Sequence, residues 1–65
     1  MARFAVTFAC DNAAFANGEL CPEIARILIW LGINLRDHPI DAAGPAGGAL
    51  RDYNGNRVGE WRYEP

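Results

Sequence analysis

The clearest pattern along the chain is a helical one between residues 22 and 35. At about 100° per residue, its large aliphatic side chains fall within one stripe roughly 100° wide. The stripe consists of Ile24, Ile27, Leu28, Leu31 and Leu35. Pro22 suits the first helical position because its missing N–H costs nothing there, and Glu23 faces the positive end of the helix dipole. The pattern predicts a helix over Pro22–Leu35, with Cys21 at the N-cap and the aliphatic stripe facing the core.

A period of two precedes the helix. Phe4, Val6, Phe8 and Cys10 alternate with small or polar residues. Such alternation predicts a half-buried strand over Phe4–Cys10 with its aromatic side chains inward. Residues 11–15 are expected to form a short turn, which Asp11 caps and from which Phe15 returns to the core.

A third pattern, over Ala49–Tyr63, predicts a β-hairpin. Asp52-Tyr53-Asn54-Gly55 is typical of a type I turn closed by a bulge glycine. This turn would pair Leu50 with Val58 and leave Trp61 on the outer face of the hairpin. We therefore expect a bulge at Gly59, which brings Trp61 back to the core side.

The helix and the hairpin are joined by a segment rich in Gly, Pro and Ala, which we expect to be a flexible connector over 36–48. Together the elements predict an α+β fold of β-α-β-β topology. One helix packs on a three-stranded antiparallel sheet of strand order 1-3-2, since a sheet this small can leave one face open to water. The 65 residues form a single domain, 1–65. A domain of that size buries only about 60% of its unfolded surface, so it is marginally stable.

The side of the helix that points away from the aliphatic stripe is apolar as well. Arg26, Ile29, Trp30 and Ile33 gather there. One interpretation is that Trp30 simply lies along the surface over a neighbouring loop, because single exposed apolar residues are common. The other is that the four residues bind a protein partner or a second copy, since Trp and Arg dominate many interfaces. We favour the interface, because three large residues share the patch.

Composition and charge narrow the class of protein. The net charge of −2 gives no electrostatic footprint for nucleic acid. The longest apolar run contains Arg26 and is far shorter than the roughly 20 residues of a membrane span, so no membrane insertion is expected.

No secretory signal is recognisable, which favours a cytoplasmic location where thiols stay reduced. Cys10 and Cys21 could lie close together, but we do not expect a disulfide between them.

No pattern of catalytic or metal-binding residues emerges. Two cysteines and one histidine match no zinc-ligand spacing. Cys21 at a helix start could be reactive, but His38 would lie about 20 Å away at the far end of the helix. One spacing resembles a calcium loop: Asp52, Asn54, Asn56 and Glu60. Arg57 and Tyr63 stand where that loop needs Gly and a bidentate Glu. We predict no enzyme, and no metal, cofactor or small-molecule substrate.

The hairpin suggests an alternative function, in which its aromatic rings and arginines stack single-stranded bases. The residues concerned are Arg51, Tyr53, Arg57, Trp61, Arg62 and Tyr63. Asp52, Glu60 and Glu64 alternate with the arginines and leave the local field nearly neutral, so a cross-strand charge ladder explains the pattern more simply. Nucleic-acid binding is therefore the alternative, and protein binding the first hypothesis.

Three blocks of the sequence carry a family resemblance. They are Asp-Asn-Ala-Ala-Phe at 11–15, Glu-Ile-Ala-Arg-Ile-Leu at 23–28 and Leu-Arg-Asp-Tyr-Asn-Gly-Asn-Arg-Val-Gly at 50–59. Together they resemble small, mostly uncharacterised proteins encoded by phages, prophages and similar mobile elements. The resemblance implies a small accessory protein in the cytoplasm of a bacterial host, suited to modulate or inhibit a host system. In such proteins the outer side of the helix tends to be polar, whereas here it carries Ile29, Trp30 and Ile33, which strengthens the interface hypothesis.

Overall fold

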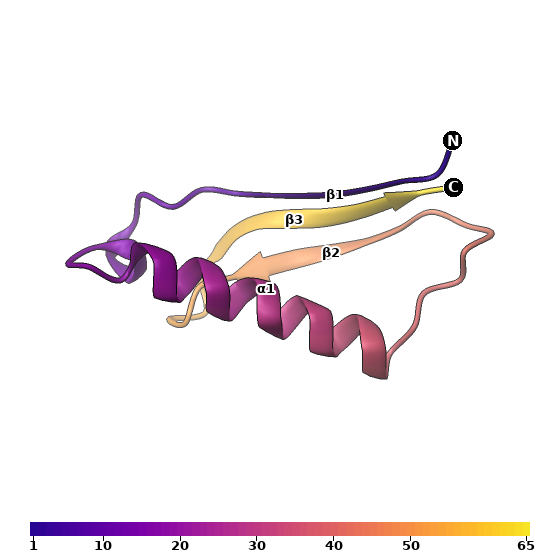
Figure 1. Cartoon of the computed structure of the whole chain (residues 1–65). Helices are drawn as coiled ribbons and strands as arrows, with labels where there is room; N and C mark the ends of the chain where they lie inside the picture. The colour runs from indigo at the N-terminus through magenta and orange to yellow at the C-terminus, as the bar shows by residue number, and fades with distance from the viewer.

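The computed structural model describes all 65 residues and shows one helix beside a three-stranded sheet (Figure 1). The elements are strand β1 (Arg3–Phe8), the 3₁₀ helix η1 (Ala13–Phe15), helix α1 (Leu20–Asp37), strand β2 (Ala46–Arg51) and strand β3 (Arg57–Glu64). The sheet is antiparallel throughout, with the order β1-β3-β2. The predicted α+β fold, its β-α-β-β topology and its strand order are confirmed. Neither helix combines the length and the hydrophobicity that a membrane span requires.

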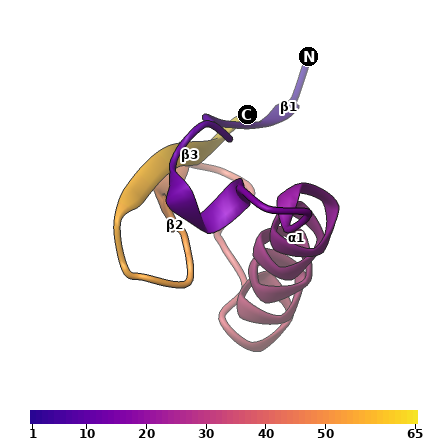
Figure 2. The same ribbon diagram turned by 90° about the vertical axis from the view of Figure 1, so that its left-hand side faces the viewer.

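Helix α1 lies on one side of the sheet, next to β2, as the view along the helix shows (Figure 2). Helix and strands are closest at the end that holds η1 and the β2–β3 turn, and they diverge toward the chain termini (Figure 1). The molecule measures 41 × 20 × 17 Å, and its radius of gyration is 12.8 Å. A compact chain of this length would have a radius of about 11 Å. The fold is therefore elongated and is held together mainly at one end.

The core lies between α1, η1 and the inner face of the sheet. Its buried apolar residues are Ala14, Phe15, Ile27, Leu31 and Leu50. The inner face is set by the register, in which Phe8 and Leu50 both pair with Gly59 from opposite sides. One pair further along, Val6 lies opposite Trp61, and both residues pack against the core. The alternation predicted for the first strand thus places Val6 and Phe8 against the core, whereas Phe4, on the same face, is 45% exposed.

The hairpin register differs from the prediction by one residue. Leu50 pairs with Gly59 and Arg51 with Arg57, so Val58 is the extra residue of a bulge. The bulge therefore comes one residue earlier than predicted. Its consequence is the expected one, because Trp61 lies on the inner face and packs against the core.

Two glycines of the sheet let neighbouring groups approach closely. A Cβ on Gly59 would clash with the carbonyl oxygen of Thr7 in β1. A Cβ on Gly48 would lie 2.7 Å from the indole nitrogen of Trp61, which packs over this glycine. Both positions therefore exclude a larger residue unless the sheet or the indole moves.

The boundaries of the helix differ from those predicted. Helix α1 extends over Leu20–Asp37, so Cys21 lies inside its first turn and not at the N-cap. The N-cap residue is Glu19, whose side chain makes no capping hydrogen bond. The first-turn N–H groups have no helical partner in any case, so Pro22 is tolerated as the third helical residue, two positions later than predicted.

The strands also begin and end elsewhere than predicted. The first strand ends at Phe8 and not at Cys10: its last pair is with Gly59, and one further bond follows, from the N–H of Ala9 to the carbonyl oxygen of Val58 at 2.9 Å. At the other end of the sheet, residues 46–48 belong to β2 and pair with the last part of β3. The connector predicted at 36–48 is therefore shortened to residues 38–45.

Candidate protein-interaction surface

The four predicted partner-binding residues lie on the outer side of α1, and we call them the helix patch: Arg26, Ile29, Trp30 and Ile33. Ile29 is 62% exposed, Trp30 45% and Ile33 46%. Residues three and four apart are neighbours on a helix surface, so these apolar side chains form one continuous area. The connector does not cover it, because the chain leaves the end of α1 and turns back toward β2 (Figure 1).

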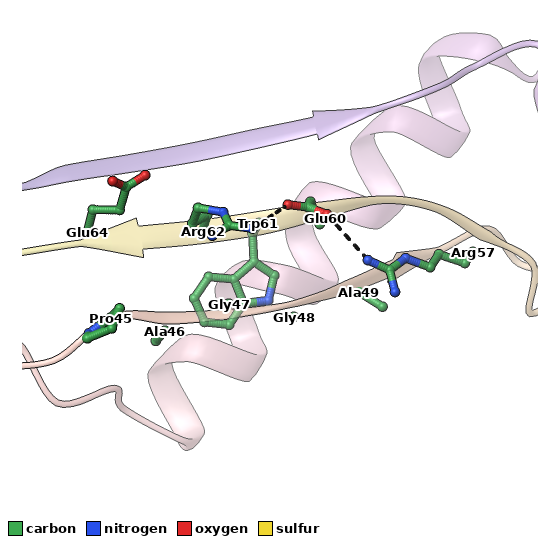
Figure 3. Close-up of a pocket in the computed structure, with 10 residues that line it drawn as sticks. All are labelled: Pro45, Ala46, Gly47, Gly48, Ala49, Arg57, Glu60, Trp61, Arg62 and Glu64. Atoms are coloured by element: carbon green, nitrogen blue, oxygen red, sulfur yellow. Dashed lines mark hydrogen bonds and ion pairs between the residues drawn. The ribbon is translucent and has the colours of Figure 1, made fainter.

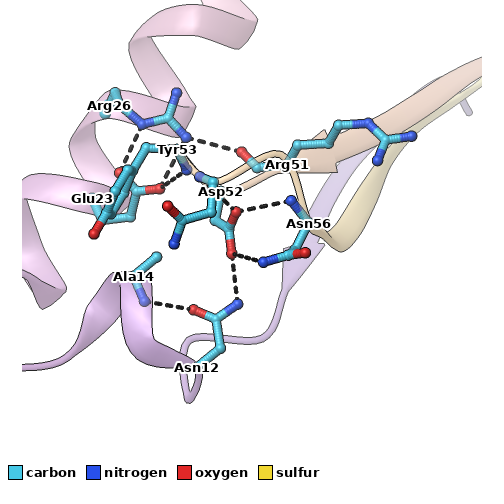
Figure 4. Close-up of polar contacts among 9 residues, drawn as sticks. Asn12, Ala14, Glu23, Arg26, Arg51, Asp52, Tyr53 and Asn56 are labelled. Atoms are coloured by element: carbon cyan, nitrogen blue, oxygen red, sulfur yellow. Dashed lines mark hydrogen bonds and ion pairs between the residues drawn. The ribbon is translucent and has the colours of Figure 1, made fainter.

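Arg26 connects the helix patch to the rest of the fold. Its Nε and one terminal nitrogen donate to the two carboxylate oxygens of Glu23, at 2.7 and 2.9 Å. The same terminal nitrogen donates to the carbonyl oxygen of Arg51, the last residue of β2, at 2.9 Å (Figure 4). The Arg26 side chain is nevertheless 41% exposed. It is therefore held in one position while it still presents a charged edge to solvent.

A small hollow of about 260 Å³ lies beside the helix patch. It is lined by Arg26, Trp30, Ala49, Arg51 and Asp52. These residues come from α1, from β2 and from the start of the turn. The indole of Trp30 thus borders a concave area as well as the convex outer side of the helix.

Two buried carboxylates beneath the patch were not predicted from the sequence. Glu23 and Asp52 are each only 4% exposed. Glu23 accepts a hydrogen bond from the backbone N–H of Tyr53 at 2.8 Å, in addition to those from Arg26. One oxygen of Asp52 accepts from the N–H groups of Asn54 and Asn56, both at 2.9 Å (Figure 4). The carboxylates therefore hold the β2–β3 turn and tie it to α1.

Asn12 extends this polar cluster to η1. Its side-chain nitrogen donates to Asp52 at 2.7 Å, and its side-chain oxygen accepts from the N–H of Ala14 at 3.0 Å. The residue that caps the 3₁₀ turn is thus Asn12, where the sequence predicted Asp11. No buried side-chain nitrogen or oxygen lacks a hydrogen-bond partner. Asn12, Glu23, Arg26 and Asp52 form what we call the polar cluster. It joins η1, α1 and the β2–β3 turn at the end of the fold where helix and sheet are closest.

The same hydrogen bonds lower the pKa of both carboxyl groups. The bonds from Arg26 lower the pKa of Glu23 against the opposing effect of burial, and Glu23 in turn raises the pKa of Arg26. Burial raises the pKa of Asp52, but the donors on Asn56, Asn12 and Asn54 together outweigh it and lower that pKa. Both groups are charged acceptors at neutral pH, surrounded by donors of the chain itself. Their arrangement suits them to hold structure and does not resemble a proton-donating pair.

The hairpin residues of the nucleic-acid alternative do not share one face of the sheet. Trp61 and Tyr63 lie on the inner face, where Trp61 stacks against Phe4 with ring centroids 5.7 Å apart. The hydroxyl of Tyr63 donates to the carbonyl oxygen of Ala42 in the connector, at 3.2 Å. The two rings therefore support the fold on the side of the sheet that faces α1.

The arginines of this alternative lie elsewhere on the hairpin. Arg57 and Arg62 both pair with Glu60, at 3.4 and 3.1 Å, beside the glycines of β2 (Figure 3). Arg51 donates to the carbonyl oxygen of Gly55, and the exposed Tyr53 lies in the turn. The charges are thus balanced locally and separated from the two rings of the inner face.

The two cysteines carry free thiols, that of Cys10 being partly buried and that of Cys21 exposed. Comparison of the chain with protein-family models, with curated proteins and with solved structures gives no match.

Proposed function

We propose that the chain is a non-enzymatic interaction protein that binds a protein, or a second copy of itself, through the helix patch. One observation carries the proposal. Ile29, Trp30 and Ile33 are about half exposed and contiguous, although the opposite side of the same helix buries Ile27 and Leu31. A helix that is apolar on both sides is normally covered on both sides.

The exposed area supports the same conclusion. The three apolar side chains together expose roughly 300 Å², which reaches the size of patches that are often functional. The whole chain exposes 4546 Å². A compact protein of 7.1 kDa would expose about 4,100 Å². This elongated fold thus presents more surface than its mass requires.

Arg26 adds a favourable feature to the patch. A flexible arginine loses side-chain entropy when a partner immobilises it, which weakens binding. Here Glu23 and the carbonyl oxygen of Arg51 already fix the guanidinium. A partner therefore meets a charged group that is pre-organised beside Trp30.

The resemblance to proteins of phages and mobile elements supplies the proposed setting. In that setting the partner is a protein of the bacterial host or of the element itself, and the chain modulates or inhibits it in the host cytoplasm. This part of the proposal depends on the resemblance and not on the geometry.

Two glutamate substitutions test the proposal, because the helix offers a matched pair. Ile33 is 46% exposed inside the helix patch, and Leu28 is 47% exposed on another side of α1. Tagged Ile33→Glu and Leu28→Glu chains are compared with the parent in pull-downs from host lysate and by sedimentation. We expect Ile33→Glu to lose partners or self-association that Leu28→Glu retains. Equal behaviour of the two variants would refute the role of the patch.

A salt titration with single-stranded oligonucleotides separates the alternative function. Phosphate-dominated binding falls steeply with salt concentration. We expect no binding at low salt. Tight binding at low salt that is lost with added salt would support the nucleic-acid alternative instead.

A further inference from the structure

We propose that the occupant of the helix patch is a second copy of this chain, whose α1 packs antiparallel to the first about a two-fold axis. This inference rests on the proposed function, since it names the partner of the same patch. A two-fold interface uses one surface twice, so that surface must be complementary to itself. The charges and the shape of α1 meet this condition.

The outer side of α1, from the helix patch to the end of the helix, carries charges of opposite sign at its two ends. Arg26 lies near one end and Asp37 is the last residue of α1. They are about 16 Å apart along the helix axis. In an antiparallel pair with Trp30 opposite Ile33 of the second copy, Arg26 lies opposite Asp37 of that copy, because both pairs straddle the same midpoint. The favourable contact then occurs twice.

A parallel pair would reverse this advantage. It would place Arg26 beside its own copy and Asp37 beside its own copy, and like charges at such distances destabilise helix contacts. Asp37 is bound at present only by Arg36, through an exposed ion pair of 3.0 Å. Exposed pairs of this kind contribute little, so Asp37 is free to exchange its partner.

One flank of the exposed surface carries small residues, which let a second helix approach. Ala25 and Gly32 flank Ile29 at the helical spacings of four and three residues. Even a Cβ added to Gly32 would meet nothing within 4 Å. Small residues beside large ones let one helix ridge enter the groove of another at the usual 8–10 Å between axes.

The area decides how strong such a dimer can be. Two copies would bury about 600 Å² of apolar surface if Ile29, Trp30 and Ile33 of each copy were covered completely, with Arg26 and Asp37 as a polar rim. Stable interfaces bury about 1,200–2,000 Å² in total. The dimer is therefore reversible and forms at high protein concentration.

Sedimentation of the full chain over about 10 µM to 1 mM tests the association. We expect the parent and Leu28→Glu to shift from monomer to dimer over this range. Ile33→Glu and Asp37→Arg are expected to stay monomeric. Asp37→Arg should keep the fold, because a basic residue is favourable at a helix C-terminus, and far-UV circular dichroism checks this. A parent that is monomeric throughout, or an Asp37→Arg chain that associates like the parent, overturns the inference.

Cross-linking tests the orientation separately. The antiparallel pair places Ala25 and Arg36 of the second copy on the same side of the interface and at nearly the same level, whereas a parallel two-fold pair places these flanks on opposite sides of the interface. Chains with Ala25→Cys and with Arg36→Cys, both lacking the native cysteines, are mixed and oxidised. We expect mixed disulfides between the two kinds of chain. If mixed disulfides do not form, the antiparallel arrangement is overturned.

The outcomes also separate this inference from the proposed function. A chain that stays monomeric, yet captures a protein in pull-downs only while Ile33 is intact, overturns self-association and leaves the helix patch as a binding site. A chain that neither associates nor captures a protein through Ile33 overturns both.

Discussion

Replacement of Glu23 by glutamine removes the charge from the centre of the polar cluster while it keeps the size of the side chain. The parent carboxylate accepts three hydrogen bonds, two from Arg26 and one from the N–H of Tyr53. A glutamine has one acceptor oxygen, so its amino group must face at least one of these donors. The perturbation therefore leaves a donor without an acceptor in a site that is almost closed to water.

The magnitude follows from the burial of the two partners. Breaking a fully buried ion pair from one side costs about 3–5 kcal/mol. Arg26 is partly exposed and can recover contacts with water, so we expect a loss closer to about 2–3 kcal/mol for Glu23→Gln, the cost of one or two charge-assisted hydrogen bonds. For a domain of this size that loss lowers Tm by roughly 10–20 °C.

The assay is urea and thermal unfolding followed by far-UV circular dichroism, with Glu60→Gln as the matched control. Glu60 also pairs with two arginines, Arg57 and Arg62, but through an exposed carboxylate. Exposed pairs contribute about 0–1 kcal/mol, so the control should differ little from the parent. If Glu23→Gln is no less stable than Glu60→Gln, the polar cluster does not hold α1 to the turn.

Two further predictions concern acid and the glycines. The pKa values of Glu23 and Asp52 are lowered in the folded state, so the unfolded chain binds more protons as the pH falls. The stability that these groups contribute should therefore be present above about pH 4–5 and be lost as the pH falls through the lowered pKa values. Urea midpoints measured against pH should fall more steeply for the parent than for Glu23→Gln. Gly59→Ala should destabilise the fold by about 2 kcal/mol or more, because the added Cβ meets the carbonyl oxygen of Thr7. Gly32→Ala should stabilise α1 by about 0.5–1 kcal/mol, because its Cβ meets nothing. Urea unfolding measures both changes, and equal effects would contradict the packing described for the sheet.

The parts of the fold that were predicted correctly depend on local chemistry. The Asp-Tyr-Asn-Gly tetrad forms the expected turn, in which the N–H of Gly55 donates to the carbonyl oxygen of Asp52 at 3.0 Å. Gly55 has the positive φ of 87° that favours glycine there. The alternation in β1 and the stripe on α1 likewise predicted which sides face the core, except that Leu28, at the edge of the stripe, is 47% exposed. Such patterns involve neighbours in sequence, so they can be recognised without knowledge of the rest of the chain.

The parts that were missed depend on partners far apart in sequence. The polar cluster joins Asn12, Glu23 and Asp52, and no local pattern indicates that a glutamate in a first helical turn lies beneath a hairpin turn. Residues 46–48 have weak strand preference of their own, but β3 supplies their backbone partners and Trp61 packs over Gly48. Tertiary pairing thus extended a strand that composition alone would have left as a loop.

The two tryptophans lie in opposite surroundings, and this gives the unlabelled chain two optical reporters. Trp30 is 45% exposed on α1, while Trp61 is partly buried and stacked against Phe4 on the inner face. A water-soluble collisional quencher such as iodide should reach the first indole readily and the second poorly. Docking on α1 would shield Trp30 and leave the emission of Trp61 unchanged, whereas unfolding would open both rings to the quencher. Occupancy of the surface and loss of the fold can therefore be told apart in a single fluorescence titration.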